Sequence, residues 1–162
     1  MSTFASSMLV DRLGRKVLLL ISIIIMSLSL TALGVFFFIQ ESNSKAASDL
    51  GWLPLSSLCL YIIAFALGFG PIPWLMLSEV YSKEVNGIAS PLSGALNWSL
   101  AFFITATFGT ISAGIGIGST FWIFAGLSVI GSIFVFLIVP ETKGKSMLEI
   151  QRTLAGEKNL II

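Results

Sequence analysis

Apolar residues run along this chain in long blocks, and charged residues are confined to the segments between the blocks. Three stretches contain no Asp, Glu, Lys or Arg, namely residues 17–40, 50–78 and 85–140. The third stretch is 56 residues long and contains a Gly- and Ser-rich segment, ISAGIGIGS at 111–119, that favours a turn. The pattern therefore predicts four membrane-length segments, at about 17–39, 55–77, 88–110 and 119–139.

Each predicted segment is long enough to cross a bilayer, because a hydrocarbon layer of ~30 Å needs ~20 helical residues. A backbone in lipid must satisfy its own hydrogen bonds, so each segment is expected to be a helix despite its content of Ile, Val and Phe. The predicted fold class is therefore all-α, a polytopic membrane protein with four transmembrane helices.

The composition supports this prediction and argues against several kinds of function. The chain of 162 residues is 56% hydrophobic and 10% charged, with a mean hydropathy of +0.98, whereas soluble domains carry about a quarter charged residues. Its net charge of +1 gives no electrostatic case for binding nucleic acid. With one cysteine (Cys59), no histidine and no charged residue in the spans, we expect no intrachain disulfide, metal site, cofactor or enzymatic acid–base chemistry.

The basic residues indicate how the helices are oriented in the membrane. The loops of one side carry Lys45, and the other side carries eight basic residues: Arg12, Arg15, Lys16, Lys83, Lys143, Lys145, Arg152 and Lys158. Because cytoplasmic loops are enriched in Lys and Arg, both termini are predicted to be cytoplasmic. A cleaved secretory signal is a poorer interpretation of 17–40, since that run is long, lacks a small-x-small cleavage site and is followed by three more spans.

The second span contains strong helix breakers in the stretch GFGPIPW, residues 68–74. Pro71 and Pro73 have no backbone N–H to donate, and nearby glycines weaken the same turn, so the helix is expected to kink or unwind near 68–73. In lipid such a break is tolerated where it lines a polar cavity or packs against other helices. Two interpretations remain at this point: a packing kink with Trp74 as an interfacial anchor, or a functional break.

Four motifs, in this order and spacing, resemble the sugar porter family of the major facilitator superfamily. They are VDRLGRK at 10–16, GFGPIPW at 68–74 with Glu79 shortly after, NW at 97–98, and PETKGKSMLEIQ at 140–151. The resemblance implies that the four spans match helices 9–12 of a major-facilitator fold. The combination of the second and fourth motifs is most similar to insect facilitated trehalose transporters and related hexose carriers.

The resemblance also implies roles for residues inside the membrane. Trp74 would lie by the central sugar path, and Gly70, Pro71 and Pro73 would form a gate. Asn97 would face the sugar; it belongs to a small, polar stripe at helical spacing, made of Ser90, Ser93, Asn97, Ala101 and Thr105. Helix packing through small residues is the favoured interpretation for Ser90 and Ser93, and sugar contact for Asn97.

At the cytoplasmic side, the resemblance implies a charge network that closes the inner gate. In it the loop residues Asp11, Arg12 and Arg15 pair with Glu79 and Glu141. The alternative is that these charges only fix the orientation and remain solvated. The proline and arginine that usually follow the first glutamate in the family are here Ser82 and Asn86, which removes one branch of the network.

The expected organisation is a remnant of a preceding helix and a cytoplasmic loop at 1–16, a four-helix transmembrane part at 17–139 and a cytoplasmic tail at 140–162. The family's seventh helix and amino-terminal half have no counterpart in this sequence, so it is interpreted as a fragment whose partner is that missing half. The expected function is transport of a sugar, trehalose or a hexose, across the plasma membrane by alternating access. The absence of ionisable residues in the spans favours facilitated diffusion over proton coupling. The alternative is a truncated, transport-inactive protein that associates with full-length carriers.

Overall fold

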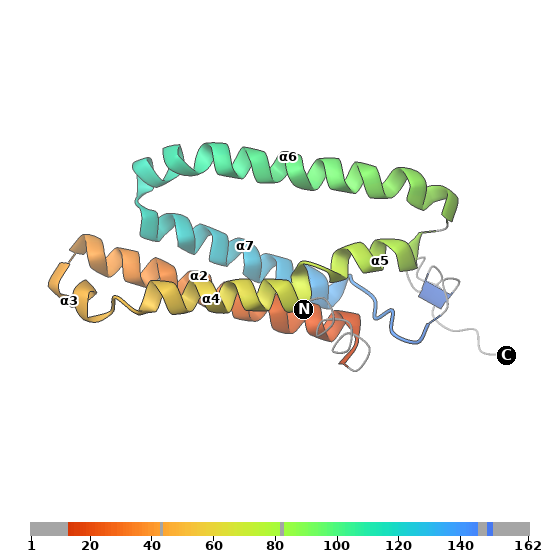
Figure 1. Cartoon of the computed structure of the whole chain (residues 1–162), viewed down its shortest axis with the longest axis horizontal. Coiled ribbons are helices and arrows are strands. Elements are labelled where there is room, and N and C mark those ends of the chain that lie inside the picture. Colours follow the sequence, from red (N-terminus) through yellow and green to blue (C-terminus); the bar gives the residue numbers. More distant parts are fainter. Residues whose placement is uncertain (1–12, 43, 82, 146–148, 151–162) are drawn as a thin grey trace.

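The computed structural model describes residues 13–42, 44–81, 83–145 and 149–150, which are mainly helices joined by short turns (Figure 1). No strand occurs among these residues. In chain order the elements are α2 (Arg15–Ser42), α3 (Ser44–Asp49), α4 (Leu53–Ala64), a π-helical turn η1 (Phe65–Phe69), α5 (Ile72–Val80), α6 (Lys83–Ile115) and α7 (Ile117–Leu137).

Four helical stretches are long and apolar enough to cross a membrane, which confirms the prediction of four spans. They are Arg15–Ser42, Leu53–Val80, Val85–Ile115 and Ile117–Leu137. The predicted turn at 111–119 is much shorter than expected, because helix continues to Ile115 and resumes at Ile117. A single residue, Gly116, makes the turn with φ of 86°, a left-handed conformation that glycine adopts without strain.

The centre of the molecule is α2, which packs along α7 and against α4. In its most apolar 18-residue window 56% of the positions are buried, against 22% or less in the other spans. Small residues allow the close approach to α7: a Cβ on Gly118 would lie 2.9 Å from the Gly34 carbonyl oxygen. Ser27 of α2 also donates a hydrogen bond to the Ala125 carbonyl of α7, at 3.2 Å.

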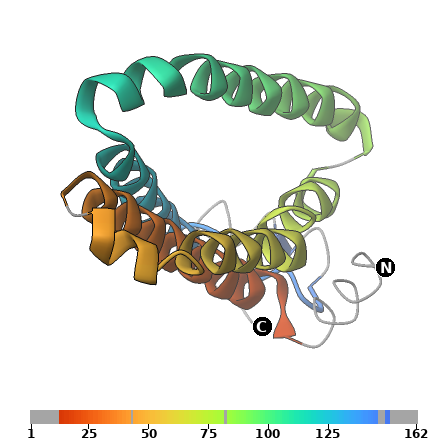
Figure 2. The same cartoon turned by 60° about the vertical axis from the view of Figure 1, so that its left-hand side comes forward.

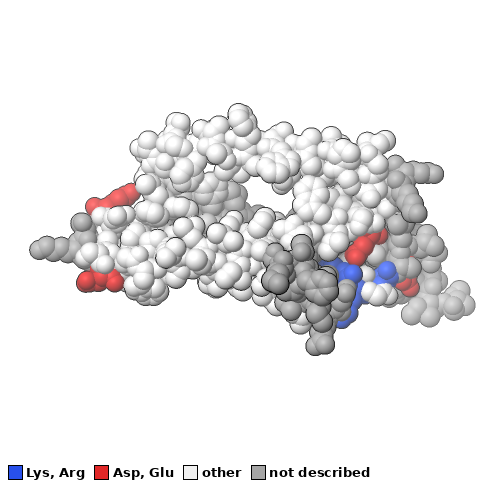
Figure 3. All heavy atoms as spheres, viewed as in Figure 1, with Lys and Arg blue, Asp and Glu red and all other residues white. Residues whose placement is uncertain are grey.

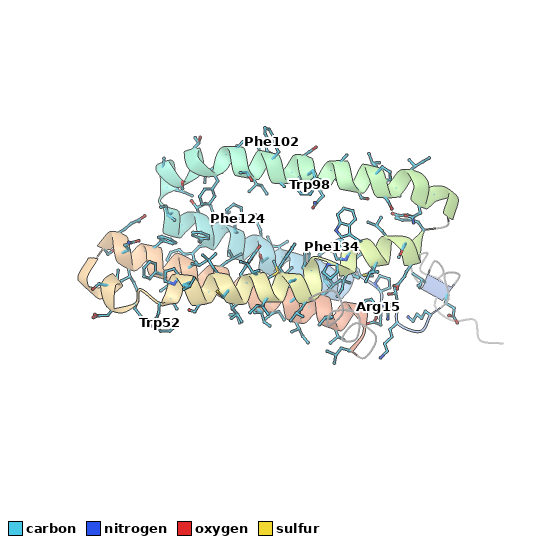
Figure 4. The ribbon with its side chains drawn as sticks, viewed as in Figure 1. Arg15, Trp52, Trp98, Phe102, Phe124 and Phe134 are labelled. Atoms are coloured by element: carbon cyan, nitrogen blue, oxygen red, sulfur yellow. The ribbon has the colours of Figure 1, made fainter. Side chains whose placement is uncertain are left out.

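The long helix α6 stands apart from the other elements (Figures 1 and 2), and the most apolar window of its span has no buried position. It meets the rest of the molecule mainly towards its two ends, through α5 and α7. Phe102, labelled in Figure 4, is 76% exposed on its outer side. Such an apolar, unburied helix is suited to hydrocarbon or to further helices as its surroundings.

Charged side chains lie at the two ends of the molecule, as Figure 3 shows for the described residues. Basic and acidic groups meet at one end, where α2 begins and α5 ends, and acidic groups lie at the other, near α3. On the face seen in Figure 3, the described residues between the two ends are uncharged, as a bilayer requires. A buried apolar cluster joins α2, α5 and α7 near the first end: Leu18, Leu19, Ile72, Met76 and Val135.

Candidate functional site

The second span is broken, as predicted, but one turn earlier than expected. Regular α-helix ends at Ala64, a π-helical turn covers Phe65–Phe69, and α-helix resumes only at Ile72. The break, as we call residues 65–71, therefore begins three residues before the predicted range of 68–73. Turns of this type occur often at functional sites.

The prolines explain why the chain leaves α-helical geometry here. Pro71 and Pro73 have no N–H, so the i→i−4 hydrogen bonds from these positions cannot form. Gly70 instead donates to the Phe65 carbonyl, five residues back, at 2.8 Å. Pro71 then precedes α5 with φ of −84°, and Pro73 lies in the first turn of α5, where a missing N–H is tolerated.

A serine of the neighbouring helix α2 contacts this break. The Ser22 hydroxyl donates to the Ala64 carbonyl at 2.6 Å and accepts from the Phe69 N–H at 3.2 Å. The sequence did not single out Ser22, because its span contains several serines with similar apolar neighbours. Gly68 and the prolines indicate that another helix packs against the break. They do not indicate which residue of that helix makes the contact.

Trp74 extends from α5 towards α6. A Cβ on Gly94 of α6 would lie 3.9 Å from Cη2 of the indole, which is ordinary van der Waals distance. Asn97 lies one helical turn further along α6, and its side chain is exposed. The structure thus places Trp74 beside the segment of α6 that carries Asn97.

Two cavities of about 500 Å³ each lie between α6 and the elements opposite it, where the space-filling view shows a hollow (Figure 3). Phe69 of the break lines both cavities, and Pro73 lines one of them together with Ser93 of α6. Their walls are mainly apolar. Neither Trp74 nor Asn97 lines either cavity.

Three residues of the predicted charge network, Arg15, Glu79 and Glu141, meet where α2 begins, α5 ends and the chain continues beyond α7. Thr142 joins them, and we call these four residues the charge network. Arg15, labelled in Figure 4, lies at the start of α2. It forms an ion pair with Glu79 near the end of α5, with Nη2 and Oε1 3.1 Å apart. The other oxygen of Glu79 accepts from the Thr142 hydroxyl at 2.6 Å. The side chains of Arg15 and Glu79 are 18% and 28% exposed, so the pair is partly shielded from solvent.

Glu141 has a different environment from Glu79. Its carboxylate accepts from the backbone N–H groups of Arg15 at 2.9 Å and Lys16 at 3.1 Å, which are the first N–H groups of α2. An anion at a helix N-terminus satisfies N–H groups that lack intrahelical partners. Gly14 makes this approach possible, because its φ is 90° and a Cβ there would lie 2.7 Å from the Glu141 carboxylate.

The structure therefore brings Arg15, Glu79 and Glu141 together. It places Gly70 and Pro71 in the break and Pro73 in the first turn beyond it. The other two residues predicted for the charge network, Asp11 and Arg12, lie outside the described residues. Among the described residues no group of three metal-ligating side chains occurs.

The family model for "Sugar (and other) transporter" matches residues 1–154. The chain belongs to this transporter family. It is 46% identical over 155 residues to the facilitated trehalose transporter Tret1 of Culex quinquefasciatus and also to that of Apis mellifera ligustica. These alignments cover 96% of this chain and 30% of each relative.

Solved structures that are similar to this chain are also of sugar transporters. The inward-open xylose transporter XylE from E. coli superposes with a TM-score of 0.80 at 30% identity, over 94% of this chain and 33% of that protein. The proton:xylose symporter XylE bound to 6-bromo-6-deoxy-D-glucose gives a TM-score of 0.79. The chain therefore spans about a third of the length of these proteins. The predicted fold class, an all-α polytopic membrane protein with part of a major-facilitator fold, is confirmed.

Proposed function

We propose that this chain forms part of a carrier that moves trehalose or a hexose across the plasma membrane by facilitated diffusion. The observation that carries the proposal is the break at 65–71, which faces a membrane-embedded hollow in a chain of the sugar transporter family. Discontinuous helices at midplane cavities are a recurrent feature of secondary transporters. The similarity to proteins named facilitated trehalose transporters supports the choice of sugar.

Trp74 and Asn97 are the proposed sugar contacts. An indole offers a flat apolar face for the C–H groups of a sugar ring, and an amide both donates and accepts hydrogen bonds, as sugar hydroxyls do. Trp74 lies on α5 and Asn97 on α6, and both helices contribute residues to the cavity walls. Closing of α5 about the break would bring Trp74 over a bound sugar, and Gly70, Pro71 and Pro73 would act as the gate.

The charge network is the proposed inner latch. It ties α5, the element that follows the break, to α2 and to the residues after α7. The proposal is that these contacts separate when the carrier opens inward, which would make the network a local contact that differs between the two states. The proposed orientation, with both termini cytoplasmic, rests on the eight basic residues that would then face the cytoplasm.

A second candidate is favoured by the unburied helix α6, whose most apolar window has no buried position. On this reading the chain alone does not transport and instead associates with other transmembrane helices. The proposed partner is a full-length carrier, against whose helices the unburied α6 would pack. No nucleic acid or cofactor enters either proposal.

Uptake measurements distinguish the two candidates. The grafted carrier, as we call it, is the Culex relative with its matching residues replaced by this chain, 46% identical to them. We expect saturable uptake of radiolabelled trehalose or a hexose that is unaffected by collapse of the proton gradient. The chain expressed alone and the unmodified relative serve as controls. Surface expression of the grafted carrier without saturable sugar uptake would rule out the proposed function.

A further inference from the structure

The Ser22 hydroxyl stands between two backbone groups of the broken helix. It donates to the Ala64 carbonyl at 2.6 Å and accepts from the Phe69 N–H at 3.2 Å. These groups belong to residues five apart, which are the acceptor and donor that a π-helical turn would pair. Side-chain insertion into a helix's hydrogen-bond ladder is a known cause of helix distortion.

Burial makes these hydrogen bonds important. Ser22 is 3% exposed and Gly68 is buried beside it. A buried backbone group that loses its partner has no water to replace it, so in a membrane the free-energy cost of the unsatisfied group is not offset. A second acceptor, the Met26 sulfur, lies 3.7 Å from the Ser22 hydroxyl, but the carbonyl is nearer and the stronger acceptor.

Gly68 permits this contact. A Cβ at position 68 would lie 2.5 Å from Cβ of Ser22 and 3.0 Å from the Leu18 carbonyl oxygen, so any larger residue would push α2 away from the break. A serine side chain is short, and it reaches both Ala64 and Phe69 only because the two helices approach this closely.

Three other described hydroxyls of α2 make different contacts. Ser29 donates to the Ile25 carbonyl and Thr31 to the Ser27 carbonyl, each within its own helix. Ser27 donates across to α7, but to a carbonyl of regular helix. Among these described residues, only Ser22 both donates to and accepts from another span, and it does so at that span's break.

We propose that Ser22 is a positioning residue for the gate, which holds the break in the observed conformation. This proposal rests on the proposed transport function. Its consequence is that α5 is fastened to α2 near both of its ends, by Ser22 at Phe69 and by Arg15 at Glu79. Movement of α5 as a gate therefore requires both contacts to change. Ser22 sets how readily the end of α5 next to the break moves.

Hydrogen exchange of the purified grafted carrier tests the positioning role directly. Ser22→Ala should raise the exchange rate of the amides in 65–69 about tenfold, the effect of losing one hydrogen bond to buried backbone. Ser27→Ala is the matched control, because it removes a buried hydroxyl from the same helix, and exchange in 65–69 should stay as in the wild type. Equal exchange in the two variants would overturn the proposal.

Kinetics of uptake and a double variant complete the test. Ser22→Ala should change the maximal uptake rate about threefold or more while the KM for the sugar changes little, since a gate step and not sugar contact is affected.

Gly68→Ala should raise exchange in the same segment, and the two substitutions together should have less than the sum of their effects, because both disrupt one contact. Additive effects would contradict the proposal. The two proposals can fail separately. If the grafted carrier shows no uptake but its amides at 65–69 are protected and lose that protection in Ser22→Ala, the transport function is disproved and the positioning role stands.

Discussion

At the scale of single residues, Glu79 and Glu141 show what sequence reasoning reached and where it stopped. Both were expected to meet the Arg-rich loop, and both lie against the start of α2. Glu79 pairs with the Arg15 guanidinium, whereas the hydrogen bonds to Glu141 come from backbone N–H groups. Charge alone predicts attraction, but helix capping depends on the left-handed turn at Gly14, which a sequence does not reveal in advance.

Removing the charge of Glu79 should favour the conformation that is open to the cytoplasm. Glu79→Gln keeps the shape of the side chain but loses the ion pair with Arg15. Because the pair is partly exposed, we expect the ratio of cytoplasm-open to closed molecules to rise by up to about fivefold. The measurement is the rate at which a cytoplasmic thiol reagent labels Ser93→Cys, a cavity-lining position, in the grafted carrier with Cys59→Ser. Glu41→Gln, at the opposite end, is the control. Unchanged labelling in Glu79→Gln would indicate that the pair only fixes orientation.

Two substitutions test the proposed sugar contacts. Asn97→Ala should weaken sugar affinity about ten- to a hundredfold, as expected when a bound hydroxyl loses its partner in a dry site. Trp74→Leu keeps apolar bulk but loses the flat face, so transport should fall while membrane insertion is unchanged. Radiolabelled uptake over a range of sugar concentrations, normalised to surface protein, gives both quantities. Wild-type affinity in both variants would assign Trp74 and Asn97 to helix packing.

At the scale of elements, the break in the second span could be predicted because proline chemistry is local. Pro71 and Pro73 lack N–H groups wherever they occur, so loss of regular helix nearby follows from the sequence. The upstream start of the break, at Phe65, could not be predicted, because it depends on a contact from another helix. That contact joins the Ser22 hydroxyl to the Ala64 carbonyl, which lies 42 residues away in the chain. Long-range contacts of this kind leave no periodic pattern in a sequence.

Restoring helix-compatible residues tests whether the break serves transport. In the grafted carrier, Pro71→Ala combined with Pro73→Ala returns two N–H donors to the backbone, so α-helix should extend through this region. We expect transport per surface molecule to fall by about tenfold or more, with surface expression reduced less. Normal transport per molecule with lower expression would favour a packing kink.

At the scale of the whole molecule, the number of spans could be predicted but their packing could not. Hydropathy identifies segments that avoid water, and all four spans appear in the structure. It does not distinguish a helix surrounded by protein from one surrounded by lipid, since both environments are apolar. The predominantly buried α2 and the unburied α6 therefore both qualify as spans by length and apolarity, although their places in the fold are opposite.

The orientation of the whole molecule gives the last prediction. With eight basic residues on the side of the termini against Lys45 on the other, we expect both termini in the cytoplasm. In a Cys59→Ser background, Ser48→Cys should react with a membrane-impermeant thiol reagent added to intact cells, and Lys145→Cys should react only after the cells are permeabilised; both positions are exposed. Lys145→Cys leaves the imbalance in place, because it removes one basic residue from the larger group. Labelling of Lys145→Cys in intact cells would reverse the orientation, and with it the placement of the charge network, since Arg15 and Glu79 would then close an outer gate.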